Sequence, residues 1–198
     1  MGKAKRKSSQ TTTDTLTPLQ SPLQALQNLL EQYNEKGVII GGVAASILGT
    51  PRYTVDLDAV FLLSLEDVPG LIQAASAQGM ESRVPDPLAM ARKNRILLLR
   101  HTASGIDIDL SLGFLPFEIE MVERSQLIEV GSTKLRLPTP EDLIIMKAVA
   151  HRTKDLEDIH SIALSHPGMD KERIEYWVKQ FGEALELPEL WGKISGLL

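Results

Sequence analysis

The chain has 198 residues, 43% hydrophobic and 24% charged, proportions that indicate a single globular domain and argue against wholesale disorder. It contains no cysteine, which excludes disulfides, thiol catalysis and cysteine-based zinc sites, and a cytoplasmic location is expected. The net charge is −5, and without the four basic residues among the first seven the chain has 17 basic against 26 acidic groups, which disfavours broad electrostatic capture of DNA or RNA.

The N-terminal segment differs in composition from the rest. Residues 1–20 are rich in Lys, Ser, Thr and Gln, which predicts a flexible basic tail. This tail lacks the apolar stretch of a secretory signal, and no run in the chain approaches the roughly 18 apolar residues of a membrane span. No membrane partner is therefore expected.

A helix, a strand and a second helix are predicted around a pair of glycines. Leucines at helical spacing predict a helix over 21–36 that ends at Gly37. Residues 38–40 predict a short buried strand, which runs into Gly41 and Gly42 and then into a short helix.

The middle of the chain predicts strands with intervening helices. The predicted elements are a strand at 54–63, a helix at 64–79, an ambiguous segment with two prolines at 84–94, a β-hairpin at 95–112, a short helix at 115–125 and a second hairpin at 127–137. From Thr139 onward the chain turns helical. The predicted fold class is therefore α+β: a mixed β-sheet core at 21–138, and a C-terminal helical bundle at 139–198 that packs on it as one compact unit.

Two aspartates, Asp56 and Asp58, stand beside the apolar run of the strand at 54–63, where Val55 and Leu57 are expected to face the core. Residues two apart in a strand share a face and lie about 6 to 7 Å apart. Their like charges repel unless a cation lies between them, and magnesium, a hard ion with oxygen ligands, meets that need. The alternative is a solvent-facing polar strand edge without a metal.

A second pair, Asp107 and Asp109, shares one face of a later strand. If this strand lies beside the first, one of the two completes a three-carboxylate site for two metal ions, which can clamp the phosphates of a nucleotide during in-line displacement. The glycines at 41 and 42 strengthen this interpretation, because they let backbone amides approach a phosphate and the following helix N-terminus favours negative charge.

These blocks together resemble a known family. The glycine pair followed by R-x-T-x-D-x-D is similar to the signature of the minimal nucleotidyltransferases of the DNA polymerase β superfamily. Three segments resemble more closely the AbiEii/AbiGii toxin-type branch and together span about residues 37–165; they are GGVAASILGTPRYTVDLDAVFLL, DLSLGFLPFE and PEDLIIMKAVAHRTKDLEDI. The resemblance implies a mixed β-sheet nucleotidyltransferase core in which Gly41 and Gly42 cradle the triphosphate of an NTP. This chain has Gly-Gly where many relatives have Gly-Ser, so it lacks a serine hydroxyl for a phosphate contact.

The resemblance also implies roles for the carboxylates. Asp56 and Asp58 would bind the metals, with two Mg²⁺ ions expected. Asp109 would be the third metal ligand and the general base; it is preferred over Asp107 because it stands in the D-L-S-L-G block that matches the family.

Further residues are candidates for nucleotide binding. Arg52, with Thr54 just before the aspartates, can pair with a phosphate, or else with an acidic residue on the surface. Lys147 can reach the phosphates, as the family's lysine suggests, or be a solvated helix lysine. Asp155 or Arg152 can contact the site through the R-x-K-D block, and Asp155 can instead cap the next helix.

One dense basic cluster, formed by Arg92, Lys93, Arg95 and Arg100, is either a solvated face or a docking place for RNA. Two functions follow from these observations. The first is a magnesium-dependent nucleotidyltransferase that moves a nucleoside monophosphate from an NTP to a hydroxyl of RNA, tRNA or a protein, with an antitoxin partner if the toxin-like resemblance extends to function. The second is a catalytically weak nucleotide-binding sensor of the same fold.

Overall fold

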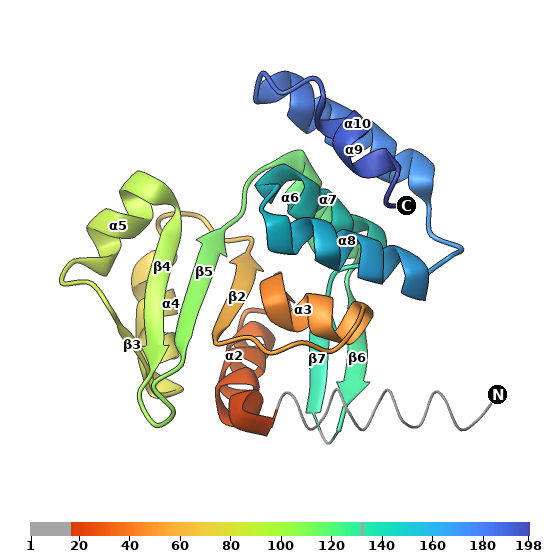
Figure 1. The fold of residues 1–198 in the computed structure, drawn as a ribbon. Helices are drawn as coiled ribbons and strands as arrows, with labels where there is room; N and C mark the ends of the chain where they lie inside the picture. The colour runs from red at the N-terminus through yellow and green to blue at the C-terminus, as the bar shows by residue number, and fades with distance from the viewer. Residues whose placement is uncertain (1–16, 132) are drawn as a thin grey trace.

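A five-stranded mixed sheet forms the centre of the protein (Figure 1). The structure is a computed structural model and describes residues 17–131 and 133–198. The strands of the sheet are β1 (Gly37–Ile40), β2 (Asp56–Phe61), β3 (Met80–Ser82), β4 (Ile96–His101) and β5 (Asp107–Leu112). They lie in the order β1-β2-β5-β4-β3; β2 and β5 run parallel, and the other neighbouring pairs are antiparallel.

Helices and a separate β-ribbon surround this sheet. The ribbon pairs β6 (Gln126–Val130) with β7 (Thr133–Leu137). The helical elements are the 3₁₀ turn η1 (Thr17–Leu19) and the helices α2 (Gln20–Gln32), α3 (Gly41–Leu48), α4 (Val68–Ala77), α5 (Pro87–Asn94), α6 (Pro116–Arg124), α7 (Pro140–Ala150), α8 (Thr153–Ser165), α9 (Lys171–Ala184) and α10 (Leu190–Ser195). Figure 1 shows α3 between β2 and the pair α7 and α8, with α9 and α10 beyond them. The predicted α+β class with C-terminal helices is confirmed, and among the described helices none is long and apolar enough to cross a membrane.

The register of β2 brings the aspartates and the glycine turn together. β1 is antiparallel to β2 and places Ile40 opposite Asp58, so the chain enters α3 directly beside this aspartate. β5 is parallel to β2 and pairs Asp56 with Asp107, and Asp58 with Asp109. The predicted adjacency of the two strands is confirmed, and the four aspartates share one face near the N-terminal ends of both strands.

The opposite face of β2 is buried in the core. Leu57, Ala59 and Phe61 have no exposed surface, and the Phe61 ring packs edge-on against Tyr33, 6.1 Å between ring centroids. Burying one large apolar side chain contributes about 2 to 3 kcal/mol. A slip of one residue would turn these side chains to solvent and the aspartates into the core, so burial fixes the register on which the site depends.

The first helix and the glycine pair differ from the sequence prediction. α2 ends at Gln32 rather than at Gly37, because Asn34 and Glu35 adopt positive φ angles of 52° and 57°, which an α-helix cannot contain. The glycine pair forms the first turn of α3, which begins at Gly41, instead of preceding that helix.

Further differences from the sequence analysis concern β2, the segment at 84–94 and β3. β2 is shorter than the predicted strand at 54–63, and Val55 is 58% exposed instead of facing the core, because it lies before the first paired residue, Asp56. The ambiguous segment at 84–94 contains α5, which is capped by the side chain of Asp86. The edge strand β3 was not predicted, because three residues are too few to show an alternating pattern.

The predicted tail at 1–20 lies, up to residue 16, outside the described residues; residues 17–19 form η1 and residue 20 begins α2. The division into a core at 21–138 and a helical portion at 139–198 stays a prediction.

A buried charge cluster fastens α9 to α7. Asp142 of α7 is fully buried, and its carboxylate accepts hydrogen bonds from Arg173 of α9 at 2.8 Å and from Arg124 of α6 at 3.3 Å. Arg173 also donates to Glu120 at 2.7 Å. Because a buried ion without a partner is costly, these contacts specify how α9 packs.

We expect Arg173→Met to lower the free energy of unfolding by about 3 kcal/mol, because it removes the better placed cation from a fully buried carboxylate. Urea denaturation followed by circular dichroism measures the change. Lys179→Met is the control: it breaks an exposed pair with Glu175 one helical turn away and should cost less than about 0.5 kcal/mol. Equal losses in the two variants would contradict the role of the cluster.

Candidate functional site

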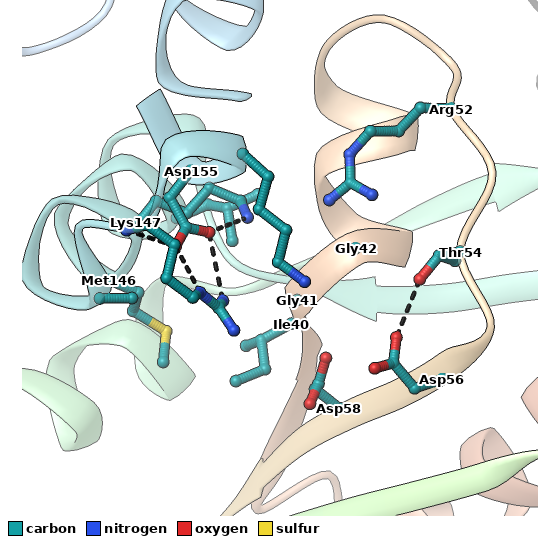
Figure 2. A pocket seen from close by; sticks show the side chains of 14 residues that line it. Ile40, Gly41, Gly42, Arg52, Thr54, Asp56, Asp58, Met146, Lys147 and Asp155 are labelled. Atoms are coloured by element: carbon teal, nitrogen blue, oxygen red, sulfur yellow. Dashed lines mark hydrogen bonds and ion pairs between the residues drawn. The ribbon is translucent and has the colours of Figure 1, made fainter. Parts of the chain in front are cut away.

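A pocket of about 240 Å³ lies between the start of α3, the beginning of β2 and the helices α7 and α8 (Figure 2). Its lining residues are Ile40, Gly41, Gly42, Arg52, Thr54, Asp56, Asp58, Leu143, Met146, Lys147, Ala150, Arg152, Lys154 and Asp155. The pocket therefore brings together every predicted site residue except Asp109. Figure 2 shows the two aspartates of β2 on one side and Lys147 with Asp155 on the facing side.

On the carboxylate side of the pocket, few hydrogen bonds from the protein offset the negative charges. Asp56 accepts a hydrogen bond from the Thr54 hydroxyl at 3.0 Å, so this buried threonine orients an aspartate. Among the described residues, no donor forms a hydrogen bond to Asp58. Burial raises the pKa of the Asp58 carboxyl to about 6, and the charges of Asp56 and Asp109 add to the rise.

The glycine turn is held against these carboxylates. Gly41 has a φ of +68°, and a Cβ atom at this position would collide with the Asp58 carboxylate. A Cβ atom on Gly42 would lie 2.5 Å from the hydroxyl oxygen of Thr54. Only glycine lets the backbone approach the aspartates this closely, and no side chain caps the first turn of α3. That the amides of this turn cradle a phosphate stays a prediction.

On β5 the two aspartates have different surroundings. Arg83, in the segment after β3, donates to Asp107 at 2.9 Å and also to Asp109. Asp107 receives a second hydrogen bond from Arg100 at 2.7 Å, and this contact holds its pKa below the usual value. Burial raises the pKa of Asp109, although Arg83 opposes the rise. The charge of Asp109 adds to the rise in the pKa of Asp58, while the choice of Asp109 over Asp107 as the third carboxylate stays a prediction.

The facing side of the pocket carries a network of cations and buried carboxylates. Lys147 is 4% exposed, so the alternative of a solvated lysine is wrong, and its ammonium contacts Asp155 at 3.1 Å and Asp158 at 2.7 Å. Arg52 binds Asp158 through two hydrogen bonds of 2.7 and 2.8 Å. Arg152 donates to Asp155 at 2.7 Å. Two carboxylates thus hold three cations at the rim of the pocket.

The two carboxylates of this network stay ionised despite their burial. Burial alone would raise the pKa of Asp155, but hydrogen bonds from Arg152 and the charge of Lys147 hold it below its usual value. Burial would likewise raise the pKa of Asp158, but hydrogen bonds from Arg52 and Lys147 hold it below its usual value. Asp155 also accepts a hydrogen bond from the backbone amide of Arg152 at 3.1 Å, so the capping role considered for it is present as well.

Carboxylate oxygens without cationic partners fit a hard divalent cation. Asp56 and Asp58 supply oxygen ligands only, and a cation between them would offset the burial, and the repulsion from Asp56, that raise the pKa of Asp58. Within 17–131 and 133–198, no three His, Cys, Asp or Glu side chains are arranged to hold a metal ion. Asp56 and Asp58 on β2 therefore could supply two ligands to such an ion, while Asp109 is bound by Arg83.

Sequence reasoning did not identify Arg83 or the role of Asp158. Arg83 lies alone in a short connecting segment, and no pattern links it to a strand two positions away in the sheet. Asp158 could have been found, because it follows Asp155 by three residues and therefore lies on the same helical face.

The comparison with known families agrees with this chemistry. Residues 14–180 match the family described as "Nucleotidyltransferase of unknown function (DUF6036)". The chain belongs to this nucleotidyltransferase family. Among curated proteins, none matches the sequence.

Solved structures share the nucleotidyltransferase fold of this DUF6036 member. The solution structure of the antibiotic-resistance factor ANT(2'')-Ia has a TM-score of 0.57 at 15% identity, over 92% of this chain and 98% of the other. The crystal structure of an antigenic nucleotidyltransferase-like protein from Paracoccidioides brasiliensis has a TM-score of 0.56 at 14% identity, over 90% and 93% of the two chains. At such identities the likeness shows the fold alone.

The raised pKa of Asp58 predicts a dependence of stability on pH. The carboxyl has a pKa of about 6 in the folded chain against an ordinary value of 3.8, so the folded state binds the proton more tightly. Stability should therefore fall as the pH rises from about 4 to about 6. Asp58→Asn removes this cost, and at pH 7 in EDTA we expect it to be more stable than the wild type by on the order of 2 kcal/mol.

Urea unfolding at pH 4 and at pH 7 measures this difference, which should vanish at the lower pH. Asp86→Asn, an exposed aspartate that caps α5, is the matched control and should follow the wild type at both values. A difference in unfolding free energy between Asp58→Asn and the wild type that stays constant from pH 4 to pH 7 would contradict a raised pKa of Asp58.

Proposed function

We propose that this member of the DUF6036 family is a magnesium-dependent nucleotidyltransferase that moves a nucleoside monophosphate from an NTP to a hydroxyl acceptor. The supporting observation is one pocket with two walls of opposite charge: Asp56 and Asp58 form the acidic wall, and Arg52, Lys147 and Arg152 form the basic wall. A metal-bound triphosphate carries charges that complement both walls.

Each wall has a separate task in binding. Asp56 and Asp58 would hold the magnesium, which when bound neutralises phosphate charge and polarises the transferred phosphoryl group. Arg52 and Lys147, fixed by buried carboxylates, would contact the phosphate oxygens. The backbone amides that follow Gly41 would donate to the same triphosphate. The cations need little reorganisation, because their partners already hold them in place.

Asp109 has the proton-transfer role. Its carboxylate lies beside Asp58 in the register of β2 and β5, and its raised pKa makes it a better base than an ordinary aspartate. The acceptor oxygen attacks the α-phosphorus, its proton passes to Asp109, and the bond to pyrophosphate breaks. Arg83 must release Asp109 for this step.

The acceptor class follows from the resemblance to AbiEii/AbiGii toxins: a hydroxyl of RNA or tRNA, or of a protein side chain, with an antitoxin as the partner that restrains the activity. The structure weakens one route to RNA. Arg95 donates to the Leu112 carbonyl at 2.8 Å and stacks over Phe114, and Arg100 pairs with Asp107. Half of the basic cluster is thus engaged within the protein.

One observation favours the alternative of a nucleotide sensor with little turnover. Arg83 occupies the carboxylate that would act as base, while the nucleotide pocket lies open beside it. A sensor needs the pocket and its cations, but does not need a free Asp109.

Incubation with α-labelled NTPs, Mg²⁺ and total RNA or cell lysate tests the proposal. We expect transfer of label by the wild type and at least a 100-fold loss in Asp56→Asn and Asp109→Asn, because each removes a metal ligand or the base. Asp86→Asn, the same chemical change at an exposed helix cap, should retain full transfer.

The outcomes separate the two functions. Transfer that survives Asp56→Asn would remove the proposed site. Magnesium-dependent NTP binding without any transfer to RNA or protein would support the sensor.

A further inference from the structure

Arg83 lies at the edge of the proposed site, outside the pocket lining. It directly follows β3, and its backbone amide donates to the Leu98 carbonyl of β4 at 2.8 Å, so the main chain is anchored to the sheet. From there the side chain reaches past β4 to β5, the next strand of the sheet.

The guanidinium group bridges the two aspartates of β5. One terminal nitrogen donates to Asp107 at 2.9 Å and the other to Asp109. The remaining nitrogen, Nε, is buried and has no hydrogen-bond partner in the described part of the chain. Contacts with the two carboxylates therefore determine where this guanidinium lies.

The two aspartates depend on Arg83 to different degrees. Asp107 has a second cation, Arg100, at 2.7 Å. For Asp109, Arg83 is the one cation within salt-bridge distance among the described residues. If Arg83 released Asp109 alone, it would keep its contact with Asp107, so a partial release needs no large movement of the chain.

Arg83 and a divalent cation require the same oxygen atoms. The guanidinium satisfies the Asp109 carboxylate, and in the described part of the chain no three carboxylates are assembled as a metal site beside Asp56 and Asp58. A cation and a guanidinium at one carboxylate also repel each other. We propose that Arg83 competes with the divalent metal for Asp109, so that metal loading of the proposed site exchanges the guanidinium for the ion while Asp107 retains Arg83.

This inference rests on the proposed function, because it assumes that Asp109 is a metal ligand. It makes Arg83 a positioning residue that sets the affinity for the metal. Binding of an ion must overcome the Arg83–Asp109 contact. The observed affinity for the ion is therefore the intrinsic affinity multiplied by the fraction of molecules in which this contact is open.

Titration of the nucleotide-free protein with Mn²⁺, with free ion measured by electron paramagnetic resonance, tests the competition without any assay of activity. We expect Arg83→Met to bind Mn²⁺ about 10-fold more tightly than the wild type, since nothing then holds Asp109 away from the ion. Arg83→Lys keeps the charge but cannot bridge both carboxylates, and should bind with intermediate affinity.

Arg100→Met is the matched control. Like Arg83→Met, it removes an arginine that contacts an aspartate of β5. Among the described residues, however, Arg100 pairs with Asp107 alone, and its side chain is half-exposed. Its affinity for Mn²⁺ should stay within about 2-fold of the wild type, since exposed charges are screened. An equal gain in Arg100→Met would reduce the effect to general charge and overturn the proposal. Circular dichroism and thermal unfolding establish that each variant is folded.

Equal or weaker Mn²⁺ binding by Arg83→Met and Arg83→Lys would also overturn the inference, because Arg83 would then support Asp109 as a ligand or play no part. If the Arg83 variants show no gain while the wild type binds Mn²⁺ and Asp56→Asn does not, the proposed site stands and the competition alone has failed. If no variant and no wild-type protein binds Mn²⁺, both the metal site and the competition are removed.

Discussion

Repulsion between carboxylates held in register is the constraint around which this protein is built. β2 and β5 run parallel with Asp58 level with Asp109, and the buried face of β2 prevents either strand from slipping. The core therefore stabilises an arrangement that is electrostatically unfavourable by itself: burial first, and then the charges of Asp56 and Asp109, raise the pKa of Asp58. A site that binds cations needs this arrangement, because carboxylates that were already neutralised by protein groups would gain little from an ion.

The basic wall of the pocket holds cations where water is partly excluded, and it leaves part of their positive charge unneutralised. Asp155 and Asp158 are both buried and together contact Arg52, Lys147 and Arg152. Two negative charges against three positive ones leave an excess of one, directed at the pocket. Such a network costs desolvation energy and is weak evidence for stability, and the proposed function gives it a role, which is to bind an anionic ligand.

Much of the site could be predicted because its signals are local. The D-x-D pattern places Asp56 and Asp58 on one face by strand periodicity alone, and a glycine pair between a strand and a helix indicates a close backbone approach. Contacts between distant segments left no such signal. The spacing of Asp155 and Asp158 puts both on one face of the following helix, but no sequence pattern gives the packing of that helix against Lys147. Arg83 reaches β5 from just after a three-residue strand that shows no periodicity. Val55 was misplaced for a related reason: the alternating sequence pattern already includes residues that precede Asp56, the first paired residue of β2.

The two aspartates of β5 show how neighbours divide residues that the sequence presents as equivalent. Asp107 and Asp109 share a face, and spacing cannot distinguish them. β4 runs antiparallel to β5 and sets Arg100 opposite Asp107, but the apolar Leu98 opposite Asp109. The strand on the other side brings Asp58 level with Asp109. Asp107 thus contacts two arginines, whereas Asp109 contacts one and lies level with a second carboxylate. The proposed function rests on this difference in surroundings when it gives the chemistry to Asp109 and leaves Asp107 to hold Arg83 in reach.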